Sequence, residues 1–178
     1  MLYLQVASFL RSDPRLDKAK IGEFIGGPKH IDVLEAFVKS FDFSDKPIEE
    51  SLRCFLATFR LPGEAQIIQR ILELFGNHWF NSFKGERVVA NADTAFVLAY
   101  AVIILNVDLH NPKNKNRMSL KDFVRNHRGL NANTDFPQSF LEGIYSSIKN
   151  HEIVMPEEQK GELKEDYEWQ VCKLLKYK

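Results

Sequence analysis

ADTAFVLAYAVIILNVDLHNP, residues 92–112, is the stretch that decides the fold of this chain. Almost every position from Ala92 to Val107 is apolar, which is typical of a central helix that is covered on all its faces. Pro112 prevents easy continuation of the helix, and a polar loop from Lys113 to Arg117 follows. Loops fixed at the end of a rigid buried helix often carry binding sites, so this end of the helix is a candidate for function.

Helical periodicity extends outward from this stretch in both directions. Apolar residues at three- and four-residue steps occur at Ile31, Leu34, Val38 and Phe41, at Ile48, Leu52, Phe55, Leu56 and Phe59, at Ile67, Ile71, Leu74 and Phe75, and at Phe140, Leu141, Ile144, Tyr145 and Ile148. No stretch alternates with period two for long enough to predict a strand. The sequence therefore predicts an all-α fold of about eight short helices joined by brief loops.

Local signals predict where several helices begin and end. Asp17 precedes a short helix that Gly26 and Gly27 would stop. Ser119 and Asp122 have the spacing of a capping box, and Asp135 with Pro137 predicts the start of the last helix.

Composition excludes several classes of protein. With 178 residues, 44% of them apolar and fourteen of them Phe, the chain can fill the core of one domain. Its 24 basic and 24 acidic residues create no global basic field for nucleic acid or lipid. The start of the chain lacks the charged n-region of a signal peptide, and the longest apolar run, Ala95 to Leu105, is about half of a membrane span. Two lone cysteines, Cys54 and Cys172, suit a reducing compartment, so we expect an intracellular protein of one domain.

A second stretch, FRLPGEAQ at residues 59–66, joins two predicted helices in an unusual way. Pro62 cannot donate a backbone hydrogen bond, and Gly63 accepts backbone angles that other residues resist. Glu64 then falls at the first turn of the next helix, where the helix dipole favours a carboxylate. Composition alone favours the interpretation that Glu64 only satisfies that helix end. The alternative interpretation is an exposed carboxylate on a rigid tip that enters a partner's site.

Other polar residues give weaker signals. Asp108 and His110 are too few for a metal site, and the sequence has neither a Ser-His-Asp order nor a Gly-rich phosphate loop. A hydrolase with Glu64 or His110 as its base therefore lacks a nucleophile or metal cluster. A local basic cluster is either a solvated face or a patch for an acidic partner or lipid head groups; it comprises Lys113, Lys115, Arg117, Lys121, Arg125 and Arg128.

The two stretches together resemble the two signatures of the Sec-seven domain family, the nucleotide exchange factors for Arf GTPases. The resemblance covers roughly residues 5–155 and implies an elongated right-handed array of about ten short helices, with a groove between the signatures. The chain opens near the third helix of that pattern, so we expect the first helices to be missing. Residues 1–155 would form the catalytic domain.

A narrower resemblance points to the large Golgi subfamily, the Gea and Golgi brefeldin-resistance type of factor. It rests on Asp13 to Lys18, on Ile21 to Ile25 and above all on Ile153 to Gln159. In that subfamily the domain is one part of a much longer chain. We therefore expect residues 156–178 to be a charged connector that leads into a following helix.

The resemblance also implies roles for individual residues. Glu64 would be a "glutamic finger" inserted toward the magnesium ion and β-phosphate of GDP on the GTPase. The groove that takes the switch regions of the GTPase, with its supporting contacts, would comprise Leu61, Pro62, Gln66, Asp93, Phe96, Ile103, Ile104, Asn106, His110, Asn111 and Met118. The inhibitor brefeldin A, which binds some members, would contact Tyr100, Ala101, Asp108 and Met118, which match the Tyr, Ser, Asp and Met of the sensitive pattern at three positions.

The function implied is the release of GDP from an Arf-family GTPase, which promotes GTP loading and coat recruitment at the Golgi. No covalent chemistry, metal or cofactor of the domain itself is expected, because nucleotide and magnesium belong to the GTPase. The location implied is cytoplasmic, peripheral at Golgi and early secretory membranes, through the full-length protein. The competing hypothesis is a non-catalytic helical adaptor that holds a GTPase or a peptide in the same groove.

Overall fold

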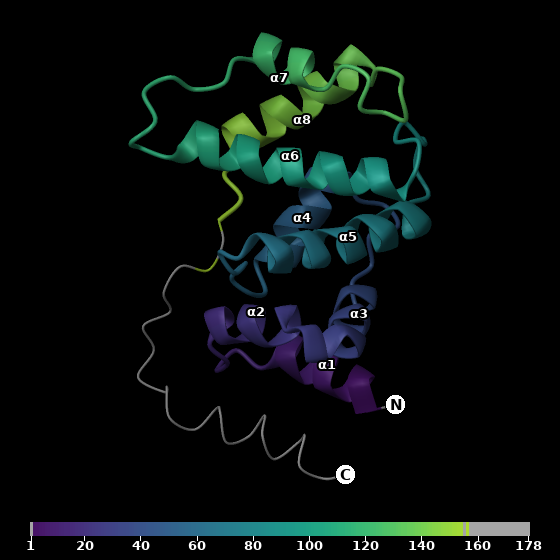
Figure 1. Cartoon of the computed structure of the whole chain (residues 1–178), viewed down its shortest axis with the longest axis vertical. Coiled ribbons are helices and arrows are strands. Elements are labelled where there is room, and N and C mark those ends of the chain that lie inside the picture. Colours follow the sequence, from purple (N-terminus) through teal and green to yellow (C-terminus); the bar gives the residue numbers. More distant parts are fainter. Residues whose placement is uncertain (1, 155, 157–178) are drawn as a thin grey trace. The chain divides into compact units, whose positions relative to one another are not determined.

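The computed structural model describes residues 2–154 and 156 of the chain. Figure 1 shows the helices in order: α1 (Leu2–Ser12), α2 (Lys18–Gly26), the 3-10 helix η1 (Pro28–His30), α3 (Ile31–Lys39), α4 (Ile48–Leu56), α5 (Ala65–Ser82), α6 (Ala92–His110), α7 (Leu120–Asn126) and α8 (Gln138–Asn150). Within the described residues there is no strand, only an isolated bridge between Asn131 and Thr134. The predicted all-α class is confirmed. The connector predicted for 156–178 lies outside the described residues except for Pro156.

The described residues form two compact units. Residues 2–41 and 55–71 make the first unit, and residues 42–54 and 72–154 make the second. The helices α4 and α5 each contribute residues to both units. Each unit is internally packed, so each is described separately below.

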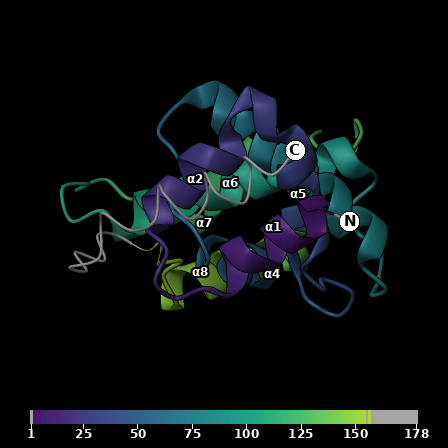
Figure 2. The same cartoon turned by 90° about the horizontal axis from the view of Figure 1, so that it is seen from below.

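The first unit has an aromatic core. In it α1 packs on α3, and a short turn joins α1 to α2 (Figure 1, Figure 2). Phe55 lies 5.3 Å from Phe41 and 5.0 Å from Phe59 between ring centroids, in T-shaped arrangements. Phe37 also makes a T-shaped contact with Phe59 at 5.8 Å. Edge-to-face geometry is the one that aromatic quadrupoles favour, so this cluster fixes the residue that begins the FRLPGEAQ stretch.

The second unit is built on α6, which packs against α8, while α7 also packs on α8. The later part of α5 approaches α6 very closely: a Cβ atom at Gly76 would lie 2.7 Å from the backbone nitrogen of Phe96. Only a residue without a side chain allows two helix backbones to come this near. Gly76 therefore sets the crossing of α5 and α6 within this unit.

The prediction that α6 is covered on all faces is wrong. Eight of its residues are buried, but Val97, Tyr100, Ile104 and Val107 are exposed at 37%, 46%, 45% and 50%. Their spacing of three, four and three places them on one line along the helix. Composition alone could not reveal this, because the exposed and buried sides of α6 are equally apolar. We call these four residues the α6 stripe.

The length of α6 also exceeds the expectation from its apolar run. The helix has 19 residues and is long and apolar enough, by length and composition alone, to cross a membrane, which the run from Ala95 to Leu105 did not indicate. Its inner side nevertheless packs on α8 as part of a core. Core helices pass the same test of length and composition, so we treat α6 as a core helix.

Most of the predicted helix ends are confirmed. Asp17 caps α2 by accepting hydrogen bonds from the backbone nitrogens of Ala19 and Lys20, and α2 ends at Gly26. Ser119 caps α7 through the nitrogen of Asp122. The role of Asp135 differs from the one predicted, which was to start the last helix. Its carboxylate accepts from the nitrogen of Gly129 at 2.7 Å and thereby stabilises the turn after α7, while α8 begins without a side-chain cap.

His127 makes the stability of the second unit depend on pH. It is 4% exposed, its Nδ1–H donates to the carbonyl of Phe123 at 2.6 Å, and within the described residues its Nε2 has no partner. Burial lowers the pKa of His127 below its ordinary value of 6.5. The unfolded chain therefore takes up the proton first, so His127 supports folding above about pH 6.5 and opposes it as the pH falls below that value.

We expect the free energy of unfolding to decrease between pH 7 and pH 5, with a contribution from His127 of at most about 1.4 kcal/mol per pH unit. Urea denaturation at a series of pH values measures it. His127→Leu should flatten this part of the profile, whereas the matched change at the exposed His151, His151→Leu, should leave it in place. An unchanged slope in His127→Leu would contradict the assignment.

Candidate functional site

The loop that carries Glu64 is anchored at its beginning. Phe59 is fully buried, and the backbone nitrogen of Arg60 donates to the carbonyl of Lys18 in α2 at 2.8 Å. Leu61 and Pro62 are half-buried. The chain therefore leaves the aromatic core at a defined point and runs along α2 toward Glu64. We call residues 60–64 the finger loop.

Glu64 lies immediately before α5, one residue earlier than the first turn in which it was predicted. Its carbonyl accepts from the nitrogens of Ile67 and Ile68 at 3.0 Å, which are the first hydrogen bonds of the helix. The side chain is exposed, and within residues 2–154 and 156 its carboxylate has no hydrogen bond or ion pair. The backbone of Glu64 thus begins α5, while its charge is left free. Gln66, in the first turn, is also exposed.

Gly63 does not have the special conformation predicted for it. Among the described glycines only Gly129 has a positive φ, and a Cβ at Gly63 would meet no atom within 4 Å. The expectation rested on the turn chemistry usual for a Pro-Gly pair, and here the chain stays in backbone regions open to any residue. Gly63 leaves open space beside Glu64.

Two glycines that sequence reasoning did not connect with the site support the finger loop instead. A Cβ at Gly22 would overlap the carbonyl oxygen of Arg60 and lie 3.3 Å from Cδ of Pro62. A Cβ at Gly26 would overlap the side chain of Ile67 in the first turn of α5. These glycines are four residues apart in α2 and so lie on one face. The signal in the sequence was the spacing Gly-x-x-x-Gly within a predicted helix.

The α6 stripe gives the second unit an exposed apolar surface. Phe96 and Ile103, predicted for the groove, are half-buried in the same helix, and Ile104 and Tyr100 belong to the stripe itself. Asp93 is exposed in the first turn of α6. Contiguous apolar side chains on a protein surface mark a site of interaction.

Asn106 does not line a surface. It is 5% exposed; its Nδ2 donates to the carbonyl of Ile153 at 3.1 Å, and its Oδ1 accepts from the nitrogen of Ile153 at 2.7 Å. Its amide therefore holds the chain that follows α8 against α6. His110 is similarly engaged, because its Nε2 lies 2.7 Å from the carbonyl of Ile148. The polar groups of these two residues serve the packing of α6 and α8.

A single carboxylate organises the loop between α6 and α7. Oδ1 of Asp108 accepts from Nδ2 of Asn114 at 2.7 Å, and Oδ2 accepts from the nitrogen of Met118 at 2.5 Å. The hydroxyl of Tyr145 donates to the carbonyl of Met118 at 2.8 Å. Asn111 is exposed, and its Oδ1 accepts from the nitrogen of Lys113 at 2.9 Å. The structure therefore brings together Asp108 and Met118, two of the four residues predicted to contact brefeldin A.

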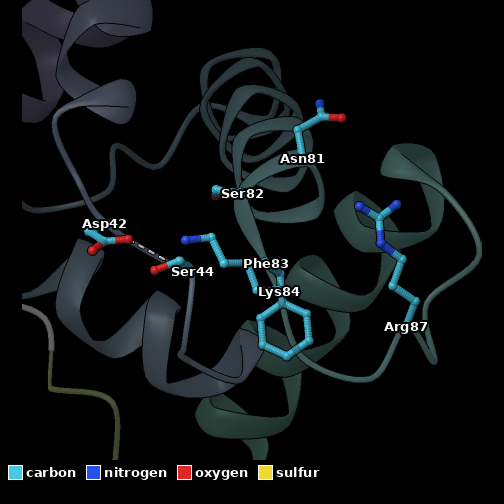
Figure 3. A pocket seen from close by; sticks show the side chains of 7 residues that line it. All are labelled: Asp42, Ser44, Asn81, Ser82, Phe83, Lys84 and Arg87. Carbon is cyan, nitrogen blue, oxygen red and sulfur yellow. Dashed lines mark hydrogen bonds between the residues drawn. The ribbon is translucent and has the colours of Figure 1, made fainter.

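An open hollow on the second unit lies among other residues (Figure 3). It is lined by Asp42, Ser44, Asn81, Ser82, Phe83, Lys84 and Arg87. Backbone and side-chain hydrogen bonds from Ser44 lower the pKa of Asp42, with smaller contributions from Lys46 and Lys84. None of the predicted site residues lines this hollow.

Side chains of metal-ligating type do not gather in the described part of the chain. Within 2–154 and 156, no group of three or more His, Cys, Asp or Glu side chains is placed to hold a metal ion. Each unit carries one candidate group: a free carboxylate on a supported loop in the first unit, and an apolar stripe in the second. An exposed apolar surface can bind a partner protein, and a free carboxylate can act on charged groups of that partner. The groove between the two signatures stays a prediction.

Known proteins are similar to this chain in sequence and in fold. A family model described as "Sec7 domain" matches residues 3–153. A Golgi-specific brefeldin A-resistance guanine nucleotide exchange factor 1 homolog of Caenorhabditis elegans is 45% identical over 93% of this chain. The brefeldin A-inhibited guanine nucleotide-exchange protein 1 of Mus musculus is 42% identical over 85%. The chain spans only 8% of the length of each of these two relatives.

Solved structures of Sec7 domains are also similar to this chain. The structure of ARF1-GDP bound to a Sec7 domain complexed with brefeldin A matches with a TM-score of 0.80 and 42% identity, covering 86% of this chain and 78% of that chain. The Sec7p catalytic domain matches with a TM-score of 0.80 and 41% identity, covering 84% and 79%. With sequence, helices and both signatures in agreement, this chain belongs to the Sec7 domain family.

Proposed function

We propose that this domain is a guanine-nucleotide exchange factor for Arf-family GTPases, and that Glu64 expels the nucleotide. The observation that carries the proposal is the exposed carboxylate of Glu64, which has no partner among the described residues and stands on a loop held by α2. The names of the relatives, which are exchange factors, support it.

The mechanism is electrostatic. A carboxylate placed about 4 Å from a phosphate is repelled by around 4 kcal/mol at an effective dielectric constant near 20. Each 1.4 kcal/mol changes an equilibrium tenfold, so this repulsion would weaken nucleotide binding by about three orders of magnitude. Because the finger loop is fixed before the partner arrives, little of this energy is lost in ordering it.

The α6 stripe supplies the opposing, favourable interaction. Its side chains are already exposed to water, so their burial against the switch regions of the GTPase would release free energy. If those switch regions become available only when the nucleotide loosens, the stripe selects the exchange-competent state. The domain would act by binding a nucleotide-free partner and would carry out no covalent chemistry.

The partner, cofactor and location follow from this proposal. Nucleotide and magnesium would be supplied by the GTPase, so the domain needs no cofactor of its own. The names of relatives that are Golgi-specific favour peripheral association with Golgi membranes through a longer protein. Loading of the GTPase with GTP would then promote coat recruitment there.

Release of a fluorescent nucleotide from Arf, with and without this protein, tests the proposal directly. An exchange factor accelerates release in proportion to its concentration and binds nucleotide-free Arf more tightly than GDP-bound Arf. A helical adaptor would bind both forms equally and leave the release rate unchanged. That second result would overturn the proposed function.

Brefeldin A should inhibit this exchange. Tyr100, Asp108 and Met118 match the sensitive pattern, and the structure brings Asp108 and Met118 into direct contact. We expect saturating drug to lower the exchange rate on a sensitive Arf at least about tenfold, which corresponds to about 1.4 kcal/mol. Ala101→Ser, which completes the pattern, should lower the concentration of drug needed. Undiminished exchange at saturating drug in both proteins would contradict this expectation.

A further inference from the structure

The strongest local charge in the chain lies in residues 113–128, which we call the basic segment. It contains six basic side chains and one acidic side chain, Asp122. Because the whole chain has 24 of each, the remaining residues carry 18 basic and 23 acidic side chains. The protein is therefore neutral overall, but its positive charge is concentrated on one loop and the helix that follows.

The positive charges of the basic segment are available to a partner. All six basic side chains are exposed. Arg125 pairs with Asp122 at 2.6 Å, whereas the other five have no ion pair within the described part of the chain; these are Lys113, Lys115, Arg117, Lys121 and Arg128. Unpaired charges on a protein surface attract an oppositely charged surface over roughly a Debye length, about 8–10 Å.

The backbone beneath these charges is fixed. Asp108 holds the loop through Asn114 and Met118, and Tyr145 holds Met118 from α8. In α7, Lys121 and Arg125 are four residues apart and so lie on one face. Figure 1 shows the loop extending beyond the end of α6 before it returns to α7. The segment thus presents its charges without a large loss of conformational entropy on binding.

We propose that the basic segment docks this domain on an anionic lipid bilayer. Clusters of four to eight Lys and Arg residues are typical of surfaces that bind anionic lipids. The charges are spread along an exposed loop and a helix, so recognition rests on their sum and suits an extended charged plane. Leu130, 41% exposed just after the segment, adds an apolar side chain that can enter the lipid head-group region.

The charge distribution also favours one part of the chain for contact with the membrane. The acidic excess in the rest of the chain is repelled by the same lipids that attract the basic segment. Contact through the basic segment is therefore favoured over contact through the rest of the chain, although the net charge is zero. This inference concerns the domain alone and does not depend on the proposed exchange activity.

Sedimentation with vesicles tests the proposal. The full chain is mixed with phosphatidylcholine vesicles that contain either no phosphatidylserine or 30 mol% of it, in low salt and in high salt. We expect binding only to the anionic vesicles, and weaker binding at high salt. Each basic side chain near such a surface contributes about fivefold to partitioning, so Lys113→Glu/Lys115→Glu/Arg117→Glu should reduce it at least about tenfold.

A matched triple variant separates location from net charge. Lys20→Glu/Lys29→Glu/Lys39→Glu changes three exposed lysines of the first unit and alters the net charge by the same amount. It should retain most of the binding, and thermal melts should show that both variants are folded. An equal loss in the two variants, or no binding of the unaltered chain to anionic vesicles, would overturn the proposal. So would binding of the segment to soluble polyglutamate without binding to vesicles, which would indicate an acidic protein as its partner.

Discussion

Glu64→Lys is expected to abolish nearly all of the acceleration of nucleotide release, while leaving the domain able to bind GDP-loaded Arf. The substitution replaces the repulsion between a carboxylate and a phosphate by an attraction of similar size. About three orders of magnitude in rate depend on that repulsion, so the variant should fall close to the spontaneous rate of release. Glu64 is exposed and its carboxylate has no partner in the described structure, so the fold should not be affected.

Two further variants identify the cause. Glu64→Gln keeps the shape of the side chain and removes its charge, so its rate should lie between those of the unaltered protein and Glu64→Lys. Glu86→Lys changes the charge of another exposed residue by the same amount and should leave exchange intact. Release rates from fluorescent nucleotide and binding by calorimetry provide the measurements. Full exchange by Glu64→Lys would rule out the finger mechanism.

Gly22→Ala is expected to reduce exchange although Gly22 lies in α2 and not in either signature. The added methyl group would overlap the carbonyl of Arg60, so α2 and the finger loop must separate. Overpacking of this kind destabilises proteins by about 1–3 kcal/mol. A displacement of about 1 Å at a positioning residue can cost about a hundredfold in rate. We therefore expect exchange to fall tenfold to a hundredfold, with a lower melting temperature.

The measurements must distinguish a displaced finger loop from a loss of folding in Gly22→Ala. Each kcal/mol lowers the melting temperature by about 2–4 °C for a chain of this size, so at 20 °C Gly22→Ala should still be folded. Relative to the unaltered protein, Gly22→Ala should keep a larger fraction of its affinity for GDP-loaded Arf than of its exchange rate, because the α6 stripe is unchanged. Gly143→Ala, where an added Cβ meets no atom within 4 Å, should leave exchange intact. Normal exchange by folded Gly22→Ala would contradict the supporting role of α2.

The helices could be predicted because their signals are local. Periodic apolar residues and caps such as Asp17 and Ser119 act within a few residues of the chain, and the structure confirms them. The support of the finger loop depends instead on the approach of residue 22 to residue 60. No periodicity reports a contact of that separation, so the support that Gly22 and Gly26 give to the finger loop was not predicted.

The contacts of the predicted site residues also could not be predicted from sequence patterns. Asn106 and His110 stand in a signature beside residues of the α6 stripe, and composition does not distinguish the side that faces α8 from the side that faces solvent. Only the packing of α8 shows that the amide of Asn106 is used by Ile153. The resemblance gave these residues a place in the family pattern, but their hydrogen bonds had to come from the three-dimensional structure.

The two hydrogen bonds of Asp108 have a consequence for evolution under brefeldin A. A cell that escapes the drug by changing position 108 would also release Asn114 and Met118, and with them the loop that carries the basic segment. Changes at Tyr100, which is exposed, or at Ala101 break no hydrogen bond of a side chain in the described structure. Resistance should therefore arise first on the surface of α6, and Asp108 should persist in resistant lineages as the costlier residue to replace.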